Sequence, residues 1–135
     1  MDESERQLTA AAGVLLAVGM AAGVWKWQAM RRSPDARAPL YVDVLHRAAL
    51  MYAAATLVLA RLVVASTFPA AWNRAAFWLC WSFFVITLAT YAVHGLRRRA
   101  TTMFSERTFF TGPGMFVLVA AELGPTLFLV VGALR

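Results

Sequence analysis

The chain has 135 residues, of which 61% are hydrophobic and only 15% are charged. A single domain of this length exposes much of its surface, so it has no core large enough to hide so many apolar side chains from water. The composition therefore excludes an ordinary water-soluble globule and indicates a protein whose apolar surface faces lipid.

The formal charge of +6 comes from twelve arginines and one lysine against seven acids. Because these basic residues gather in short connections between apolar stretches, we expect a lipid bilayer as the partner and no nucleic acid.

Four stretches are long and apolar enough to cross the hydrocarbon core as helices, for which about 20 residues suffice. They are residues 8–25, 41–66, 75–94 and 115–134. The second stretch carries charges near its ends, at Asp43, Arg47 and Arg61. We interpret it as a span because long arginine side chains can reach the membrane interface. The expected fold is an all-α integral membrane bundle of four transmembrane helices, forming a single domain over residues 1–135.

The distribution of basic residues predicts the orientation of the bundle. Cytoplasmic connections of membrane proteins carry an excess of lysine and arginine. Eight such residues lie in the first and third connections, namely Lys26, Arg31, Arg32, Arg37, Arg97, Arg98, Arg99 and Arg107. The opposite side has only Arg6, Arg74 and Arg135. We therefore expect both termini on the non-cytoplasmic side, with a bacterial inner (plasma) membrane as the location.

Ionisable side chains inside a membrane are costly, so each one is a candidate functional residue. Glu122 lies within the fourth span, and Pro125 should kink the helix beside it and free the carbonyl of Ala121. Because consecutive helices alternate in direction, several ionisable residues fall in the cytoplasmic half. We expect them to form one cluster that handles protons or ions, made of Asp43, His46, Arg47, His94 and Glu122.

Two weaker patterns concern polar and small residues. Thr87, Thr90 and His94 follow helical spacing on the third span, although threonines in membrane helices commonly bond the carbonyl four residues earlier. Gly19 and Gly23 form a G-x-x-x-G frame, which permits close helix packing within the bundle or between subunits.

The function that these residues favour is an oligomeric channel or transporter unit. A buried glutamate and two histidines can exchange protons or bind cations near the cytoplasmic mouth. Against this function, polar residues do not repeat across the full thickness of the membrane.

An alternative is electron transfer through a b-type haem between His46 and His94, two histidines at similar predicted depth on consecutive spans. Leu45, His46 and Arg47 also resemble a Leu-His-Arg tripeptide of the membrane-anchor subunits of succinate dehydrogenases, near their quinone site. In that family the tripeptide falls in the first span, whereas in this chain it falls in the second.

A third hypothesis is a structural accessory subunit of a larger membrane complex, in which polar residues only fix helix packing. A metal site built from the acids and histidines lacks a local motif. An enzyme is less favoured than the other classes, because no nucleophile lies beside a base and no phosphate-binding loop is present. Cys80, the one cysteine, is expected to be an inert core thiol.

Overall fold

The structure, a computed structural model, describes residues 2–98, 101–102 and 111–135. In this part of the chain all regular structure is helical, in the order α1 (Glu3–Arg32), α2 (Leu40–Ala65), α3 (Ala70–Arg97) and α4 (Gly114–Leu134). Each of these helices is long and apolar enough to cross a membrane. The prediction of an all-α protein with four spans is confirmed, including the second span with its charged ends.

The helices extend beyond the predicted spans because local signals set their ends. α1 begins with a capping box, in which the Asp2 carboxylate accepts from the Glu5 amide at 2.7 Å and the Glu5 carboxylate accepts from the Asp2 amide at 3.2 Å. Paired caps of this kind satisfy amide groups that have no partner within the helix. α3 follows Pro69 and begins at Ala70 rather than at Ala75, which places Arg74 within the helix. Arg99 and Arg107 of the third predicted connection lie outside the described residues.

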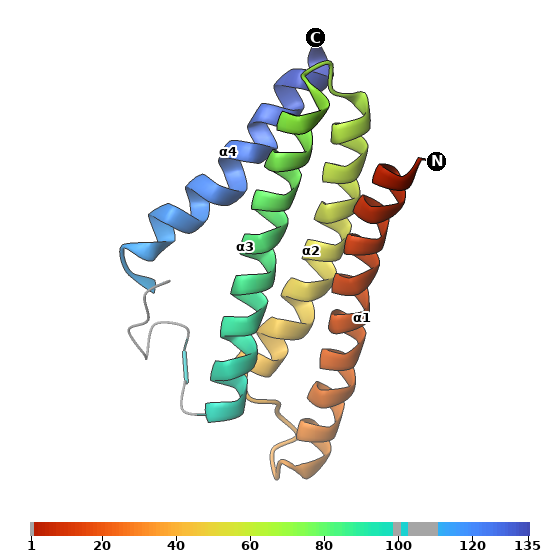
Figure 1. The fold of residues 1–135 in the computed structure, drawn as a ribbon. Coiled ribbons are helices and arrows are strands. Elements are labelled where there is room, and N and C mark those ends of the chain that lie inside the picture. Colours follow the sequence, from red (N-terminus) through yellow and green to blue (C-terminus); the bar gives the residue numbers. More distant parts are fainter. Residues whose placement is uncertain (1, 99–100, 103–110) are drawn as a thin grey trace.

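α2 is the central helix of the bundle, since it packs against each of the other three. Figure 1 shows α1 along one side of α2 and α3 along the other, with α4 next to α3 and tilted away from it. α1 and α3 also meet through a long side chain, because the Trp81 indole donates to the Ala11 carbonyl at 3.3 Å. Both termini lie toward the same end of the bundle, and the α1–α2 connection lies at the other (Figure 1).

The carboxyl-terminal half of α4 is held against the tight α2–α3 turn. The Thr67 amide donates to the Gly132 carbonyl at 3.0 Å, and the rings of Phe68 and Phe128 lie 4.7 Å apart. Leu129 is fully buried nearby. The amino-terminal half of α4 diverges from α3 (Figure 1), so α4 is anchored mainly at its carboxyl-terminal end.

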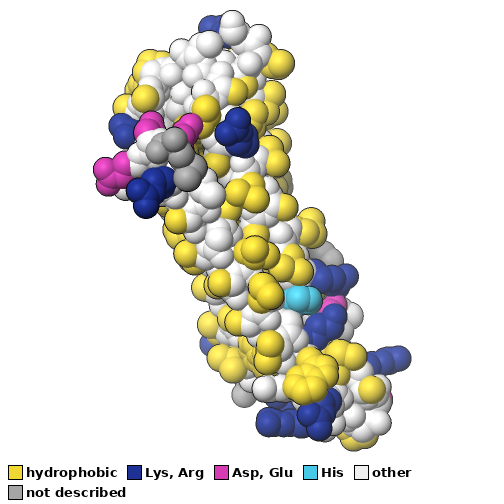
Figure 2. All heavy atoms as spheres, turned by 90° about the vertical axis from the view of Figure 1, so that its right-hand side faces the viewer, with side chains coloured by type: hydrophobic (Ala, Val, Ile, Leu, Met, Phe, Trp, Pro, Cys, Tyr) yellow, Lys and Arg dark blue, Asp and Glu magenta, His cyan; other side chains and the backbone are white. Residues whose placement is uncertain are grey.

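Much of the apolar surface of the bundle remains exposed. Large hydrophobic side chains such as Met20, Met51 and Phe116 are mostly open to the surroundings. Figure 2 shows one face, where hydrophobic side chains occupy the length of the bundle and charged ones gather toward its two ends. This distribution suits helices that face lipid in the middle and water or head groups at both ends.

Candidate functional site

The first group of predicted site residues lies between α1 and α2, toward the arginine-rich end of the bundle. The Asp43 carboxylate forms ion pairs with Lys26 of α1 at 2.6 Å and with Arg47, one turn further along α2, at 2.7 Å. The Asp43 and Lys26 side chains are each about 30% exposed. Asp43 is thus neutralised by two cations at the edge of the bundle.

His46 packs into the surface of α1 through the G-x-x-x-G frame. Its Nδ1 lies 2.8 Å from the Gly19 carbonyl oxygen. Because a carbonyl only accepts, Nδ1 must donate this hydrogen bond. A Cβ on Gly23 would lie 2.8 Å from the His46 ring, and a Cβ on Gly19 would lie equally close to the Leu50 side chain. Both glycines therefore serve the α1–α2 contact within one bundle.

Glu122 lies on the other side of α2, at the level of the middle of α3. Pro125 has no amide hydrogen, so the Ala121 carbonyl loses its helical donor. The carbonyl of Glu122, one residue further on, accepts from the Thr126 hydroxyl at 2.6 Å and from the Cys80 thiol at 3.7 Å. The side chain is half-buried and receives a long hydrogen bond from the Tyr52 hydroxyl at 3.5 Å. Cys80 is buried at this contact, so a small group of polar atoms from α2, α3 and α4 lies beside Pro125.

Three tyrosines lie between this glutamate and His94. The Tyr52 ring stacks on Phe84 of α3 with centroids 4.1 Å apart. Tyr91 lies two turns further along α3, and its ring centroid is 5.8 Å from that of Tyr41. The Tyr41 ring stacks on His94 with centroids 4.9 Å apart. We call this row, from Glu122 through Tyr52, Tyr91 and Tyr41 to His94, the tyrosine seam. It contains all three tyrosines of the chain.

The tyrosines are not among the predicted site residues, although the sequence carries a signal for them. Tyr41 and Tyr52 are eleven residues apart, about three turns at 3.6 residues per turn, so they share one face of α2. On α3 the inward positions alternate in steps of three and four, as on a bundle-facing stripe. They are Phe77, Cys80, Phe84, Thr87, Tyr91 and His94. This spacing places the tyrosines on the inward faces of α2 and α3, although it does not pair Tyr52 with Glu122.

Thr87 differs from the other hydroxyl side chains of the spans. Thr90 donates to the Ile86 carbonyl at 2.9 Å and Thr56 donates to the Tyr52 carbonyl at 2.7 Å, as expected for threonines in membrane helices. The Thr87 side chain is buried, one turn along α3 from Phe84, on which the Tyr52 ring stacks. Within the described residues the Thr87 hydroxyl has no hydrogen-bond partner of normal geometry. Buried polar atoms are normally hydrogen-bonded, so we expect a water molecule or another polar group to bond this hydroxyl.

The predicted cluster is thus divided between two helix interfaces. Asp43, His46 and Arg47 lie on the α1 side of α2, whereas Glu122 and His94 lie at the two ends of the tyrosine seam, on the α3–α4 side. Among residues 2–98, 101–102 and 111–135, no three histidine, cysteine or acidic side chains approach closely enough to hold a metal ion. The arrangement offers hydroxyl, carboxyl and imidazole groups in a row, which suits proton transfer better than the binding of a metal cation.

The two histidines that would ligate a haem face different neighbours. The His46 ring is engaged with the Gly19 carbonyl on α1, and the His94 ring is stacked on Tyr41 of α2. Bis-histidine ligation needs both rings to turn toward one common space. In this structure the printed contacts of the two rings are with different helices, α1 for His46 and α2 for His94.

The fold and the site define a class of protein: a four-helix bundle with the architecture of an integral membrane protein and a polar seam on one side of its central helix. No protein-family model, curated protein or solved structure matches this chain.

Proposed function

We propose that this chain is a proton-handling unit of a membrane, in which Glu122 exchanges protons with the arginine-rich end of the bundle along the tyrosine seam. The observation that carries this proposal is the Tyr52 hydroxyl beside the Glu122 carboxylate, at 3.5 Å. Chains of acids and histidines inside membranes commonly serve as proton relays. The proposed setting is a bacterial inner membrane with the arginine-rich end in the cytoplasm, which the bias of basic residues supports.

Each group in the seam can both give and receive a proton. A tyrosine or threonine hydroxyl has one donor and free acceptor sites, so it can pass a proton between neighbours without a lasting change of charge. Glu122 and His94 are the two groups that can store a proton, and they lie at opposite ends of the row. A water held at the buried Thr87 hydroxyl would bridge the gap between Tyr52 and Tyr91.

The relay spans only part of the bundle. Beyond Glu122, toward the termini, the core is closed by Phe77, Leu59 and Leu129, all of which are buried. A proton that reaches Glu122 therefore needs a second route out of the bundle. We propose that this route is supplied by another copy of the chain or by a larger membrane complex.

A structural accessory role is the second candidate, and a specific observation favours it. His46 and Trp81 use their polar atoms for contacts between helices, at 2.8 Å and 3.3 Å respectively. If Glu122 served packing alone, it would keep one protonation state, and the Tyr52 hydroxyl would only fix its position.

The distinguishing experiment follows the Glu122 carboxyl by infrared difference spectroscopy of the protein in liposomes after a step in pH. The proposal expects a carboxyl band that responds to the step, is absent in Glu122→Gln and responds about tenfold or more slowly in Tyr52→Phe, because proton transfer loses its nearest relay. Thr87→Ala should slow the response and Thr90→Ala, its matched control on the same helix, should not.

Flux measurements complete the test. Proteoliposomes carrying a pH-sensitive dye should show proton entry that falls to the lipid background in Glu122→Gln, with the helical content of the variant unchanged. A carboxyl that stays in one protonation state, together with flux insensitive to Glu122→Gln, would refute proton handling and favour the accessory role.

A further inference from the structure

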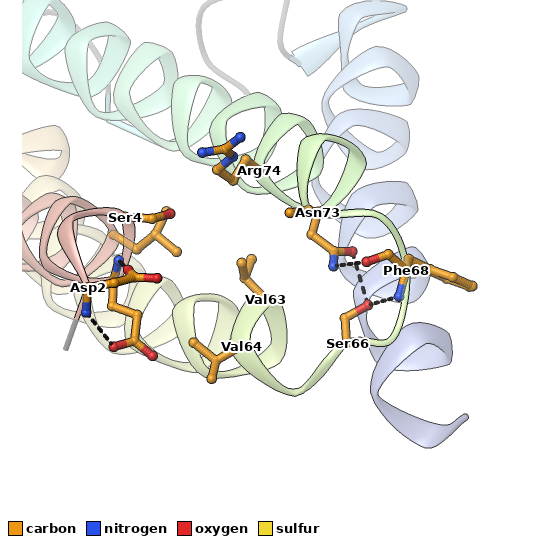
Figure 3. Close-up of a pocket in the computed structure, with 11 residues that line it drawn as sticks. Asp2, Ser4, Val63, Val64, Ser66, Phe68, Asn73 and Arg74 are labelled. Atoms are coloured by element: carbon orange, nitrogen blue, oxygen red, sulfur yellow. Dashed lines mark hydrogen bonds between the residues drawn. The ribbon is translucent and has the colours of Figure 1, made fainter.

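Two hollows lie between α1 and α3, toward the end of the bundle that carries the termini. The first, which we call the head-group hollow, has a volume of about 380 Å³ and lies between the first turns of α1, the end of α2 and the start of α3. Asp2, Ser4 and Glu5 border it from α1, and Arg74 borders it from α3. Figure 3 shows Arg74 on α3 across from Asp2 and Ser4. The hollow thus presents acidic groups on one wall and a guanidinium on the other.

The second hollow, which we call the acyl groove, lies further into the bundle along the same two helices. It has a volume of about 460 Å³ and is lined by Gln7, Ala10, Ala11, Val14, Trp78 and Trp81. The groove exists because α1 offers small alanine side chains where α3 offers two indoles. The rings of Trp78 and Trp81 meet edge to face with centroids 5.4 Å apart, so they form a stiff apolar wall.

The chemistry of the groove suits a hydrocarbon chain. The indole nitrogen of Trp81, a polar atom of this wall, is occupied by the Ala11 carbonyl at 3.3 Å. Apart from Gln7 and the indole nitrogen of Trp78, the lining groups are therefore apolar or already paired. In a bilayer such a groove is filled by lipid, because acyl chains are the solvent at this depth.

The two hollows follow one another along a single face of α3. Arg74, Trp78 and Trp81 are spaced i, i+4 and i+7, which places them in a row along the helix. α1 and α3 run in the same direction (Figure 1), so Ser4 lies near Arg74 and Ala11 lies near Trp81. A polar hollow at the level of the membrane interface thus continues into an apolar groove at the level of the acyl chains.

We propose that this surface binds one phospholipid with a zwitterionic primary-amine head group, of the phosphatidylethanolamine type. The phosphate accepts hydrogen bonds from Arg74, whose planar fork matches phosphate oxygens. The ammonium donates to the carboxylates of Asp2 and Glu5, and one acyl chain lies along Trp78 and Trp81. An anionic head group without an amine would be repelled by the two carboxylates. A trimethylammonium head group has no N–H, so it cannot donate a hydrogen bond to them. The site shares no residue with the tyrosine seam.

The binding test uses the full chain in detergent micelles and lipids that carry bromine atoms on the acyl chain, which quench tryptophan fluorescence on contact. Phosphatidylethanolamine, phosphatidylcholine and phosphatidylglycerol with identical brominated chains are titrated in parallel. The expected result is saturable quenching with a half-point about tenfold lower for phosphatidylethanolamine, since the other two lose a charge-assisted hydrogen bond. Trp81→Phe should remove a large part of the saturable signal.

Two pairs of variants locate the site. Arg74→Gln should raise the half-point about tenfold by removing the phosphate contact, while Arg61→Gln, an exposed arginine that borders neither hollow, should match the parent. Ala10→Leu should fill the acyl groove and weaken binding, while Ala54→Leu, on an exposed position of α2, should not. Native mass spectrometry of the same samples should show one retained lipid in the parent and none in Ala10→Leu.

Non-saturating quenching, equal half-points for the three lipids or a preference for phosphatidylglycerol would overturn the proposal. Equal behaviour of Arg74→Gln and Arg61→Gln would do so as well. Circular dichroism of each variant identifies any that fail to fold, and the two variant pairs alter different helices, so one pair still decides the question if the other is lost.

Discussion

Replacing Gly23 by alanine tests the close contact between α1 and α2. The new Cβ would lie 2.8 Å from Cε1 and 3.0 Å from Nδ1 of His46, so the ring must move. Overpacking of this kind costs about 1–3 kcal/mol. Moving the ring also breaks the 2.8 Å hydrogen bond to the Gly19 carbonyl, and a hydrogen bond between membrane helices contributes about 0.6–1.7 kcal/mol. We therefore expect Gly23→Ala to lower the free energy of unfolding by roughly 2–4 kcal/mol.

Gly13→Ala is the matched control, because it lies on the same helix and a Cβ there meets nothing within 4 Å. Both substitutions gain the same helix propensity, so the difference between them isolates the packing cost. Unfolding in mixed micelles with increasing denaturing detergent, followed by circular dichroism, measures both values.

Adding His46→Ala to Gly23→Ala completes the test. The double variant should be no less stable than His46→Ala alone, within about 0.5 kcal/mol, because the ring that the new Cβ strikes is gone. The reasoning fails if Gly23→Ala and Gly13→Ala are equally stable, or if the two substitutions at the contact simply add.

Two further substitutions test other contacts. Asn73, only 2% exposed, accepts from the Ser66 hydroxyl at 3.0 Å and donates to the Phe68 carbonyl at 2.9 Å. Asn73→Ala should therefore cost about 2–3 kcal/mol in detergent unfolding because partners are left unpaired, and a loss as small as that of the exposed Ser82→Ala would contradict this role. Asp43→Asn removes two ion pairs whose partly exposed members are screened by salt. We expect a loss of about 1 kcal/mol or less that shrinks in high salt, measured by the same assay, and a loss independent of salt would argue against an ionic contact.

The spans and their order could be predicted from the sequence because hydrocarbon imposes a length and a composition on every helix that crosses it. Even the charged second span followed from this constraint. The helix ends were less accurate, since α1 starts at a capping box formed by Asp2 and Glu5, and α3 starts after Pro69. These local signals lie outside the apolar windows that define a span.

The candidate site was only partly predictable. Glu122 and His94 attracted attention because ionisable side chains are rare inside membranes. Their proposed companions Asp43, His46 and Arg47 lie nearer the arginine-rich end than Glu122 does, and Asp43 and His46 contact α1. Depth follows from counting residues, whereas the face that meets a neighbour depends on how the helices are rotated against one another.

The sequence by itself determined that this chain is a bundle of four membrane-spanning helices, because burial of apolar surface in lipid depends on composition over about 20 residues and on little else. Only the tertiary structure decided which polar groups meet. Tyr52 reaches Glu122 across 70 positions of the chain, and His46 reaches Gly19 across 27. Such contacts depend on helix rotation and crossing, which small residues such as Gly23 permit through close packing, and no local pattern in the sequence records them.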